Sequence, residues 1–270
     1  MSGVLRLDQT ARLFHGGAEM AEAWLGGVRV WAKPDPLAQY YGMSEGQVNF
    51  DQPLHDPSRM TMDASNYVSA VQHAGGAGAY FNATASGSAR PLYSAAQDGL
   101  IFDGTDDLLT FANAADLIGV HCLIPVKLLS WNQYDQFGGS ASSDLTIDYN
   151  STAGTVSFIC GGGSGSILRN RRSASVPYTM GQWCLVEIRA TSTTTALAVN
   201  RTANLGTGNS TTPYLFGRLG YGSIAGRASN FVVGRSVGVI CAAGATWASP
   251  EPAVLAARQW LAQRYGITLA

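Results

Sequence analysis

The stretch SPEPAVLAARQWLAQRYGITLA, residues 249–270, predicts one helix at the end of the chain. Ser249 is suited to the N-cap and Pro250 to the first helical position, while Gly266 provides the stop. Apolar residues recur at helical spacing and form one stripe, made of Val254, Ala257, Leu261 and Tyr265. Because a helix with one apolar stripe has to be packed against something, we expect residues 250–265 to lie against a sheet.

The chain before this helix has the pattern of many short strands separated by Gly, Ser and Asn turns. Strands are predicted at residues 100–102, 108–111, 120–129, 145–149, 156–160, 183–189, 196–200 and 231–233. The clearest strand alternates Cys184, Val186 and Ile188 with Leu185, Glu187 and Arg189. This alternation indicates one buried face and one partly exposed face, as in a two-sheet antiparallel sandwich.

Three motifs carry a family resemblance. They are LAQRYGI at residues 261–267, ARPLY at 89–93 followed by GLIFDGTDDL at 99–108, and WCLV at 183–186 with AVN at 198–200. Together they resemble concanavalin A-like (laminin-G-like) domains of structural proteins in tailed phages and related particles. Arg201 departs from that family, which commonly has a turn glycine there. The resemblance implies an all-β, two-sheet antiparallel jelly-roll sandwich.

Composition limits the possible partners. Charged residues make up 13% of the chain, against about 25% in an average soluble domain. Such a surface is either hidden in an assembly or covered by neutral Ser, Thr and Gly side chains. The net charge of −1 argues against nucleic-acid binding. The sequence has no apolar run of membrane-spanning length and no signal-peptide core at its start, so we expect no membrane insertion.

The first residues differ from the rest of the chain. The segments LFHGG at residues 13–17 and WLGG at 24–27 both consist of apolar residues followed by Gly-Gly, and VRVW at 28–31 alternates apolar and polar residues as a strand does. This pattern predicts a small β-hairpin module over residues 1–36, with a hinge at residues 34–36. The module resembles adaptor segments of phage particle proteins. Its attachment residues are predicted to be Phe14, Trp24, Leu25 and Trp31. Residues 37–270 then form the jelly-roll domain with its C-terminal helix.

Four widely spaced cysteines, Cys122, Cys160, Cys184 and Cys241, lie in apolar surroundings and form no Cys-x-x-Cys pair. We expect four buried thiols rather than disulfides. The four histidines show no spacing typical of a zinc site. No cofactor is predicted.

Several acidic residues are candidates for catalysis or for metal binding. A retaining glycosidase needs two carboxyl groups about 5 Å apart, which laminarinase-like members carry as Glu-x-Asp-x-x-Glu, and this motif is absent. Asp144 and Asp148 share a predicted strand face and are interpreted as exposed or turn-capping residues. Asp103, Asp106 and Asp107 fit either ordinary turn chemistry or Ca²⁺ ligands, and turn chemistry is favoured. We therefore predict no catalytic residue and no metal.

Two segments carry groups suited to glycan binding. Trp131, Asn132 and Tyr134 combine aromatic rings with an amide, the mixture that stacks on sugar rings and hydrogen-bonds their hydroxyls. The basic cluster of Arg169, Arg171 and Arg172 is suited to carboxylate or sulfate groups of an acidic polysaccharide. The alternatives are that Trp131 packs in the core and that the basic cluster is a solvated loop.

Taken with the resemblance, these features predict a non-enzymatic structural protein of a phage-like particle, such as a head spike, fibre or tail component, that binds host surface polysaccharide. One alternative is a decoration or connector protein with no glycan site, and another is a glycan-cleaving enzyme of the jelly-roll class. The expected partners are other particle proteins and further copies of the chain. The expected location is the particle, after synthesis in the host cytoplasm and release by lysis.

Overall fold

The computed structural model describes most of the chain from residue 48 onward and several short segments before it. The described residues are 14–15, 18–19, 22–25, 28–32, 37, 48–75, 78–116, 120–130, 135–139, 143–150, 152–162, 171–172, 176–190, 194–200, 206–209, 215–220, 230–240 and 251–270.

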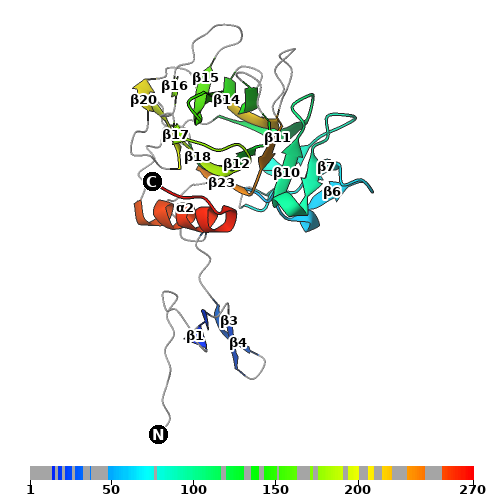
Figure 1. Ribbon diagram of the computed structural model, residues 1–270. Coiled ribbons are helices and arrows are strands. Elements are labelled where there is room, and N and C mark those ends of the chain that lie inside the picture. The colour runs from blue at the N-terminus through cyan, green and yellow to red at the C-terminus, as the bar shows by residue number, and fades with distance from the viewer. Residues whose placement is uncertain are drawn as a thin grey trace.

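Two large antiparallel sheets form the body (Figure 1). The nine-stranded sheet has the order β20-β19-β18-β12-β22-β10-β9, and β23 pairs with both β12 and β5. Its strands are β5 (Val48–Gln52), β9 (Leu92–Ser94), β10 (Gly99–Phe102), β12 (Val120–Leu128), β18 (Trp183–Ala190), β19 (Thr194–Val199), β20 (Gly206–Asn209), β22 (Phe231–Val233) and β23 (Ser236–Ile240).

The ten-stranded sheet has the order β16-β15-β14-β13-β21-β11-β8-β7-β6, and β17 pairs with β15. Its strands are β6 (Met60–Met62), β7 (Val68–Val71), β8 (Ala83–Thr84), β11 (Leu108–Asp116), β13 (Asp135–Gly139), β14 (Ser143–Asn150), β15 (Thr155–Gly162), β16 (Arg171–Arg172), β17 (Val176–Pro177) and β21 (Leu215–Gly220). Short 3-10 turns are η1 (Pro57–Arg59), η2 (Gly78–Phe81) and η3 (Ala95–Gln97).

The main core lies between the two sheets. Side chains of the nine-stranded sheet, including Phe102, Ile124 and Val186, share one buried cluster with Phe111 and Leu219 of the ten-stranded sheet. Phe102 also stacks on Phe231, with ring centroids 5.0 Å apart. The predicted all-β, two-sheet antiparallel jelly-roll sandwich with a C-terminal helix is confirmed.

The helix α2 (Glu251–Tyr265) covers the outer side of the nine-stranded sheet, as Figure 1 shows in red. A second core cluster forms there between Leu123, Leu185 and Val237 of the sheet and the predicted helical stripe of Val254, Ala257, Leu261 and Tyr265. Gly266, with φ of 64°, ends the helix as predicted. Gly234 gives Tyr265 its space, since a Cβ at that position would lie 2.5 Å from the Tyr265 hydroxyl oxygen.

The coverage by α2 corrects one expectation about β18. The face with Leu185 and Glu187 was expected to be partly exposed, yet both side chains are buried. A sheet face on the outside of a sandwich becomes interior when a helix packs on it.

Residues 40–89 are rich in Ala, Gly, Ser and Asn with weak periodicity, which predicts short strands and loops that run over the surface. From residue 48 the described part does form short strands, β5 in one sheet and β6, β7 and β8 in the other. Val68, Val71 and Phe81 are buried in the main core. These strands therefore belong to the sandwich rather than to its surface, which the weak apolar alternation did not indicate.

The described N-terminal residues form two small sheets. One pairs β1 (Phe14–His15) with β2 (Ala18–Glu19), and the other pairs β3 (Glu22–Leu25) with β4 (Val28–Ala32). The side chains of Phe14, Trp24, Leu25 and Trp31 lie outside the described part, so their role in attachment and the division at residue 36 stay predictions. Leu37 is fully buried in the cluster under α2.

Cys122 and Cys184 are buried free thiols. Burial raises the pKa of each to about 12, so both behave as small apolar core residues. The side chains of Cys160 and Cys241 are outside the described part. Among the described residues, α2 is too short and too polar to cross a membrane, and no other helix there does so.

Shortening Leu261 tests the docking of α2. We expect Leu261→Ala to lower the free energy of unfolding by about 2–5 kcal/mol, because the side chain is fully buried between helix and sheet. Leu255→Ala is the matched control on the same helix, since Leu255 is 36% exposed. Urea denaturation of the two variants gives the comparison, and equal losses would contradict the docking.

Candidate functional site

The residues predicted to bind glycan are outside the part of the chain whose side chains are described. Trp131, Asn132, Tyr134 and Arg169 are not described at all. Arg171 and Arg172 form β16, opposite Cys160 and Ile159 of β15. Asp144 and Asp148 lie on β14, opposite Gly161 and Ser157. These assignments stay predictions, and the described chemistry lies elsewhere.

An acidic turn joins the two sheets. Asp103, Asp106 and Asp107 follow β10 and lead directly into β11, so the turn crosses from the nine-stranded to the ten-stranded sheet. One carboxyl oxygen from each of the three lies within 4.8 Å of those of the other two. Gly104 permits this close turn with φ of 73°.

Hydrogen bonds hold each of the three carboxyl groups. Asp107 Oδ2 accepts the backbone N–H of Asp103 at 2.7 Å. Asp103 Oδ1 accepts the backbone N–H of Thr105 at 2.8 Å. Asp106 Oδ2 accepts the hydroxyl of Ser88. The predicted turn chemistry is therefore present, and it also fixes where the carboxyl groups lie.

Burial separates the protonation of the three groups. Asp107 is 5% exposed, and burial raises its pKa to about 7, helped by the negative charges of Asp103 and Asp106 and opposed by the hydrogen bond from the Asp103 backbone. Asp103 is exposed, and Asp106 reaches solvent beside Ser88. At a pH near 7 the buried Asp107 carboxyl group is thus about half protonated, and it lies beside two carboxyl groups that solvent can reach.

The segment beside the turn adds an aromatic and a cation. The carbonyl of Ala89 accepts the backbone N–H of Leu108, which ties residues 88–90 to the start of β11. The Arg90 guanidinium lies 5.6 Å from the ring centroid of Tyr67 and pairs with Asp63 at 2.8 Å. Tyr67 is 42% exposed, so part of its ring is open to solvent.

The turn is a poor match to a calcium site. Ca²⁺ takes about 6–8 oxygen ligands and prefers ionised carboxylates, whereas the turn offers three carboxyl groups and burial favours the neutral form of Asp107. The described residues therefore supply too few suitable oxygens for the Ca²⁺ alternative.

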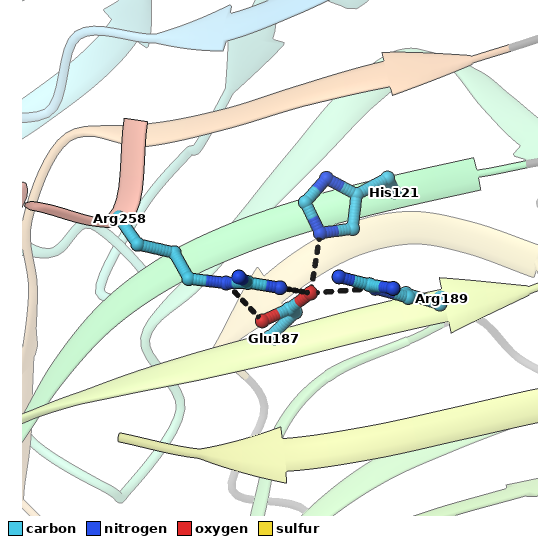
Figure 2. A network of polar contacts seen from close by, with 4 residues as sticks. All are labelled: His121, Glu187, Arg189 and Arg258. Atoms are coloured by element: carbon cyan, nitrogen blue, oxygen red, sulfur yellow. Dashed lines mark hydrogen bonds and ion pairs between the residues drawn. The ribbon is translucent and has the colours of Figure 1, made fainter. Parts of the chain in front are cut away.

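A second polar cluster is closed to solvent. Figure 2 shows His121 of β12, Glu187 and Arg189 of β18, and Arg258 of α2 converging on one carboxylate. Arg258 donates two hydrogen bonds to Glu187, from Nε at 2.7 Å and from Nη2 at 2.6 Å. His121 Nε2 and Arg189 Nε lie 2.8 and 2.7 Å from Glu187 Oε1.

The pKa shifts show how tightly this cluster is coupled. Burial alone would raise the pKa of Glu187, but the hydrogen bonds from His121 and Arg258 and the positive charge of Arg258 outweigh it and hold that pKa well below its usual value. Burial lowers the pKa of His121, although the hydrogen bond and the charge of Glu187 oppose this shift. Because His121, Glu187 and Arg258 are 0–2% exposed, the cluster joins helix to sheet and is not a substrate site.

Sequence reasoning missed this cluster. Arg258 lies on a helix 71 residues after Glu187, and only the docking of α2 brings the two together. An arginine beside the apolar stripe of α2 was the signal that a buried carboxylate faces the helix.

Comparisons with known proteins found solved structures of low similarity to this chain. No family model and no curated protein matches the chain. Trypanosoma rangeli sialidase is similar in structure at 13% identity and a TM-score of 0.48, over 83% of this chain and 34% of that chain. A β-1,3-glucanase from Mycobacterium marinum is similar at 9% identity and 0.40, over 70% and 97%. A family 16 glycosyl hydrolase protein from Mycobacterium smegmatis gives 10% and 0.36, over 55% and 77%.

These neighbours correct the predicted function. All three are named for glycan cleavage, and none is a phage protein, so the prediction of a non-enzymatic structural protein of a phage-like particle was wrong. This chain spans about a third of the sialidase. At such identities the likeness concerns the sandwich alone, and any activity has to be argued from the residues of this chain.

Proposed function

We propose that the chain cleaves glycosidic bonds, with Asp107 as general acid and Asp106 as nucleophile. The observation that carries the proposal is the acidic turn, where two carboxyl groups within 4.8 Å differ in burial and Asp107 has its pKa raised to about 7. Neighbouring carboxyl groups in opposite protonation states are the arrangement that glycosidases use for acid and nucleophile. A separation near 5 Å is typical of the retaining type.

The reaction follows from the two protonation states. Asp107 donates its proton to the glycosidic oxygen as that bond to the anomeric carbon breaks, and the Asp106 carboxylate forms an ester bond to the same carbon. Asp107, now ionised, takes a proton from water, whose oxygen attacks the anomeric carbon and releases Asp106. The products are two shorter glycans, and both carboxyl groups return to their starting states.

Neighbouring groups favour binding of a sugar at this turn. Ser88 donates its hydroxyl to Asp106 and so keeps the nucleophile oriented. Arg90, on the segment tied to the turn, lies over the ring of Tyr67, whose side chain is partly exposed. Aromatic side chains with a few placed polar groups are typical of ligand sites.

Incubation with polysaccharides tests the proposal. The full chain is incubated with a panel that includes β-1,3-glucan, arabinoxylan and a sialylated glycan, and product length is followed over time. We expect at least one polysaccharide to be shortened with new reducing ends. If every polysaccharide keeps its length, and the Asp106→Asn, Asp107→Asn double variant behaves the same way, the proposal fails.

The pH profile gives a second prediction. Activity should fall as the pH rises through about 7, because Asp107 then loses the proton that it must donate. Asp103→Asn removes a negative charge that raises the pKa of Asp107, so this variant should stay active but lose activity at a lower pH than the original chain. Initial rates measured from about pH 5 to about pH 9 cover the expected fall in activity on both sides and measure both effects. A limb that does not move in Asp103→Asn would contradict the role of Asp107.

The predicted homo-oligomer, partners and location do not depend on the acidic turn. No contact in the described part of the chain bears on the homo-oligomer, on other partners or on location in a particle, and these stay predictions. Light scattering of the purified chain measures its oligomeric state directly.

A further inference from the structure

A cavity of about 470 Å³ lies on the α2 side of the nine-stranded sheet. It opens where the start of β18, the strand β17 and the tail after α2 meet. The lining residues are Val176, Pro177, Gly181, Gln182, Trp183, Asn200, Tyr265, Gly266, Thr268 and Ala270. Cavities of about 300–1,000 Å³ are the usual size for small-ligand sites.

This cavity is separate from the acidic turn. Trp183 pairs with Lys127 on β12, which pairs with Val232 on β22, which pairs with Ile101 on β10. Three strand spacings of about 4.8 Å each therefore separate Trp183 from the strand that leads into the acidic turn, roughly 14 Å in total.

Two aromatic rings form one wall. The Trp183 and Tyr265 centroids are 4.6 Å apart and the rings are tilted by 48°. The Lys127 ammonium lies 5.0 Å from the Trp183 ring centroid, and the Tyr265 hydroxyl accepts the backbone N–H of Arg235 at 2.6 Å. These contacts fix both rings before any ligand arrives, which limits the entropy lost on binding.

Neutral polar groups stand around these rings. Gln182 is exposed at the rim, and Thr268 presents a hydroxyl from the tail. Asn200 Oδ1 accepts the backbone N–H of Leu185 at 2.8 Å, so its NH₂ group is the donor that it can offer to the cavity. Among the described residues that line the cavity there is no Asp, Glu, Lys or Arg side chain, which suits a neutral ligand.

We propose that this cavity binds a neutral sugar ring and serves as a second carbohydrate site that holds a glycan without cleaving it. The partly exposed side of the Trp183 ring packs against the apolar face of a sugar, while amide and hydroxyl groups meet its hydroxyls. The described lining residues carry no carboxyl side chain, so they offer neither the acid nor the nucleophile that cleavage needs. The cavity shares no lining residue with the acidic turn, so either proposal can fail alone.

Titration calorimetry with laminarihexaose and xylohexaose tests the inference. The full-length Asp107→Asn variant is titrated, which keeps the oligosaccharide intact if the acidic turn is active. We expect saturable binding of at least one oligosaccharide, and we expect Gln182→Ala to weaken it roughly two- to tenfold through the loss of one neutral hydrogen bond. Gln259→Ala, an equally exposed amide on α2, is the matched control and should bind normally.

Further variants identify the site of binding. Trp183→Ala should remove binding. If the Trp183→Ala variant does not fold, Thr268→Ala tests the cavity instead and should weaken binding. Tyr67→Ala, at a ring that does not line the cavity, should leave this affinity unchanged. No saturable binding of either oligosaccharide, or binding that is unchanged in both Gln182→Ala and Thr268→Ala, would overturn the inference. If the cavity fails these tests but the original chain still cleaves a glycan, the proposed function is unaffected.

Discussion

Glu187→Ala is expected to lower the free energy of unfolding by about 3–5 kcal/mol, as for other buried ion pairs that lose one partner. The variant would leave the Arg258 guanidinium, 1% exposed, without the carboxylate that accepts two of its hydrogen bonds. Urea denaturation measured at pH 7 gives the loss.

Asp98→Asn is the matched control for this prediction, because Asn tolerates the left-handed backbone of residue 98 (φ 50°) while the charge is removed. Asp98 pairs with Arg264 on the same helix at 2.8 Å, but both side chains are about one-third exposed. Exposed pairs contribute about 0–1 kcal/mol, so this variant should remain close to the original chain. If Glu187→Ala loses no more stability than Asp98→Asn, the buried cluster does not hold α2 on the sheet.

The same cluster sets the direction of the pH dependence. The folded pKa values of Glu187 and His121 lie below their usual values, so the unfolded chain takes up protons first as the pH falls. Their stabilisation is complete above the unfolded pKa of His, about 6.5, and is lost progressively on acidification. Asp107 acts in the opposite direction, because its raised pKa favours the folded chain at pH below about 7.

Asp107→Asn is expected to reduce kcat for glycan cleavage by about 10²–10⁴-fold, the usual contribution of a general acid. The amide oxygen can still accept the backbone N–H of Asp103, so the turn and the fold should be kept. Steady-state rates on the polysaccharide identified in the panel measure the loss, and a melting curve checks the fold.

Asp63→Asn serves as the control for an acidic residue close to the turn. It pairs with Arg90 at the surface and has no part in the proposed reaction, so the rate should change little. A folded Asp107→Asn variant that keeps its full rate would show that Asp107 is structural.

Most of the sandwich could be predicted from the sequence because its strands alternate clearly. The predicted residues 231–233 match β22, and residues 183–189 match β18 to within one residue. The helix followed from its cap, stripe and stop signals, and the structure gives Glu251–Tyr265 against the predicted 250–265. The prediction was weakest at residues 48–89, where short strands gain their order from pairing with distant strands rather than from local pattern.

The sites were harder to predict than the fold, for physical reasons. Asp103, Asp106 and Asp107 were recognised as a turn motif, but the raised pKa of Asp107 depends on burial that no local pattern shows. A search for catalytic carboxylates along a strand face also passes over a pair held in a turn. The cavity beside Trp183 combines residues 176–183, 200 and 265–270, which only the tertiary fold brings together.

The most direct test of the central claim, glycan cleavage by the carboxyl pair at the acidic turn, is time-resolved proton NMR of the polysaccharide during incubation. Because the two carboxyl groups lie within 4.8 Å, the first new reducing ends should carry the same anomeric configuration as the bond that was cleaved. They should not form with the Asp106→Asn, Asp107→Asn double variant. First products of inverted configuration, or no new reducing ends above those of the double variant, would contradict the claim.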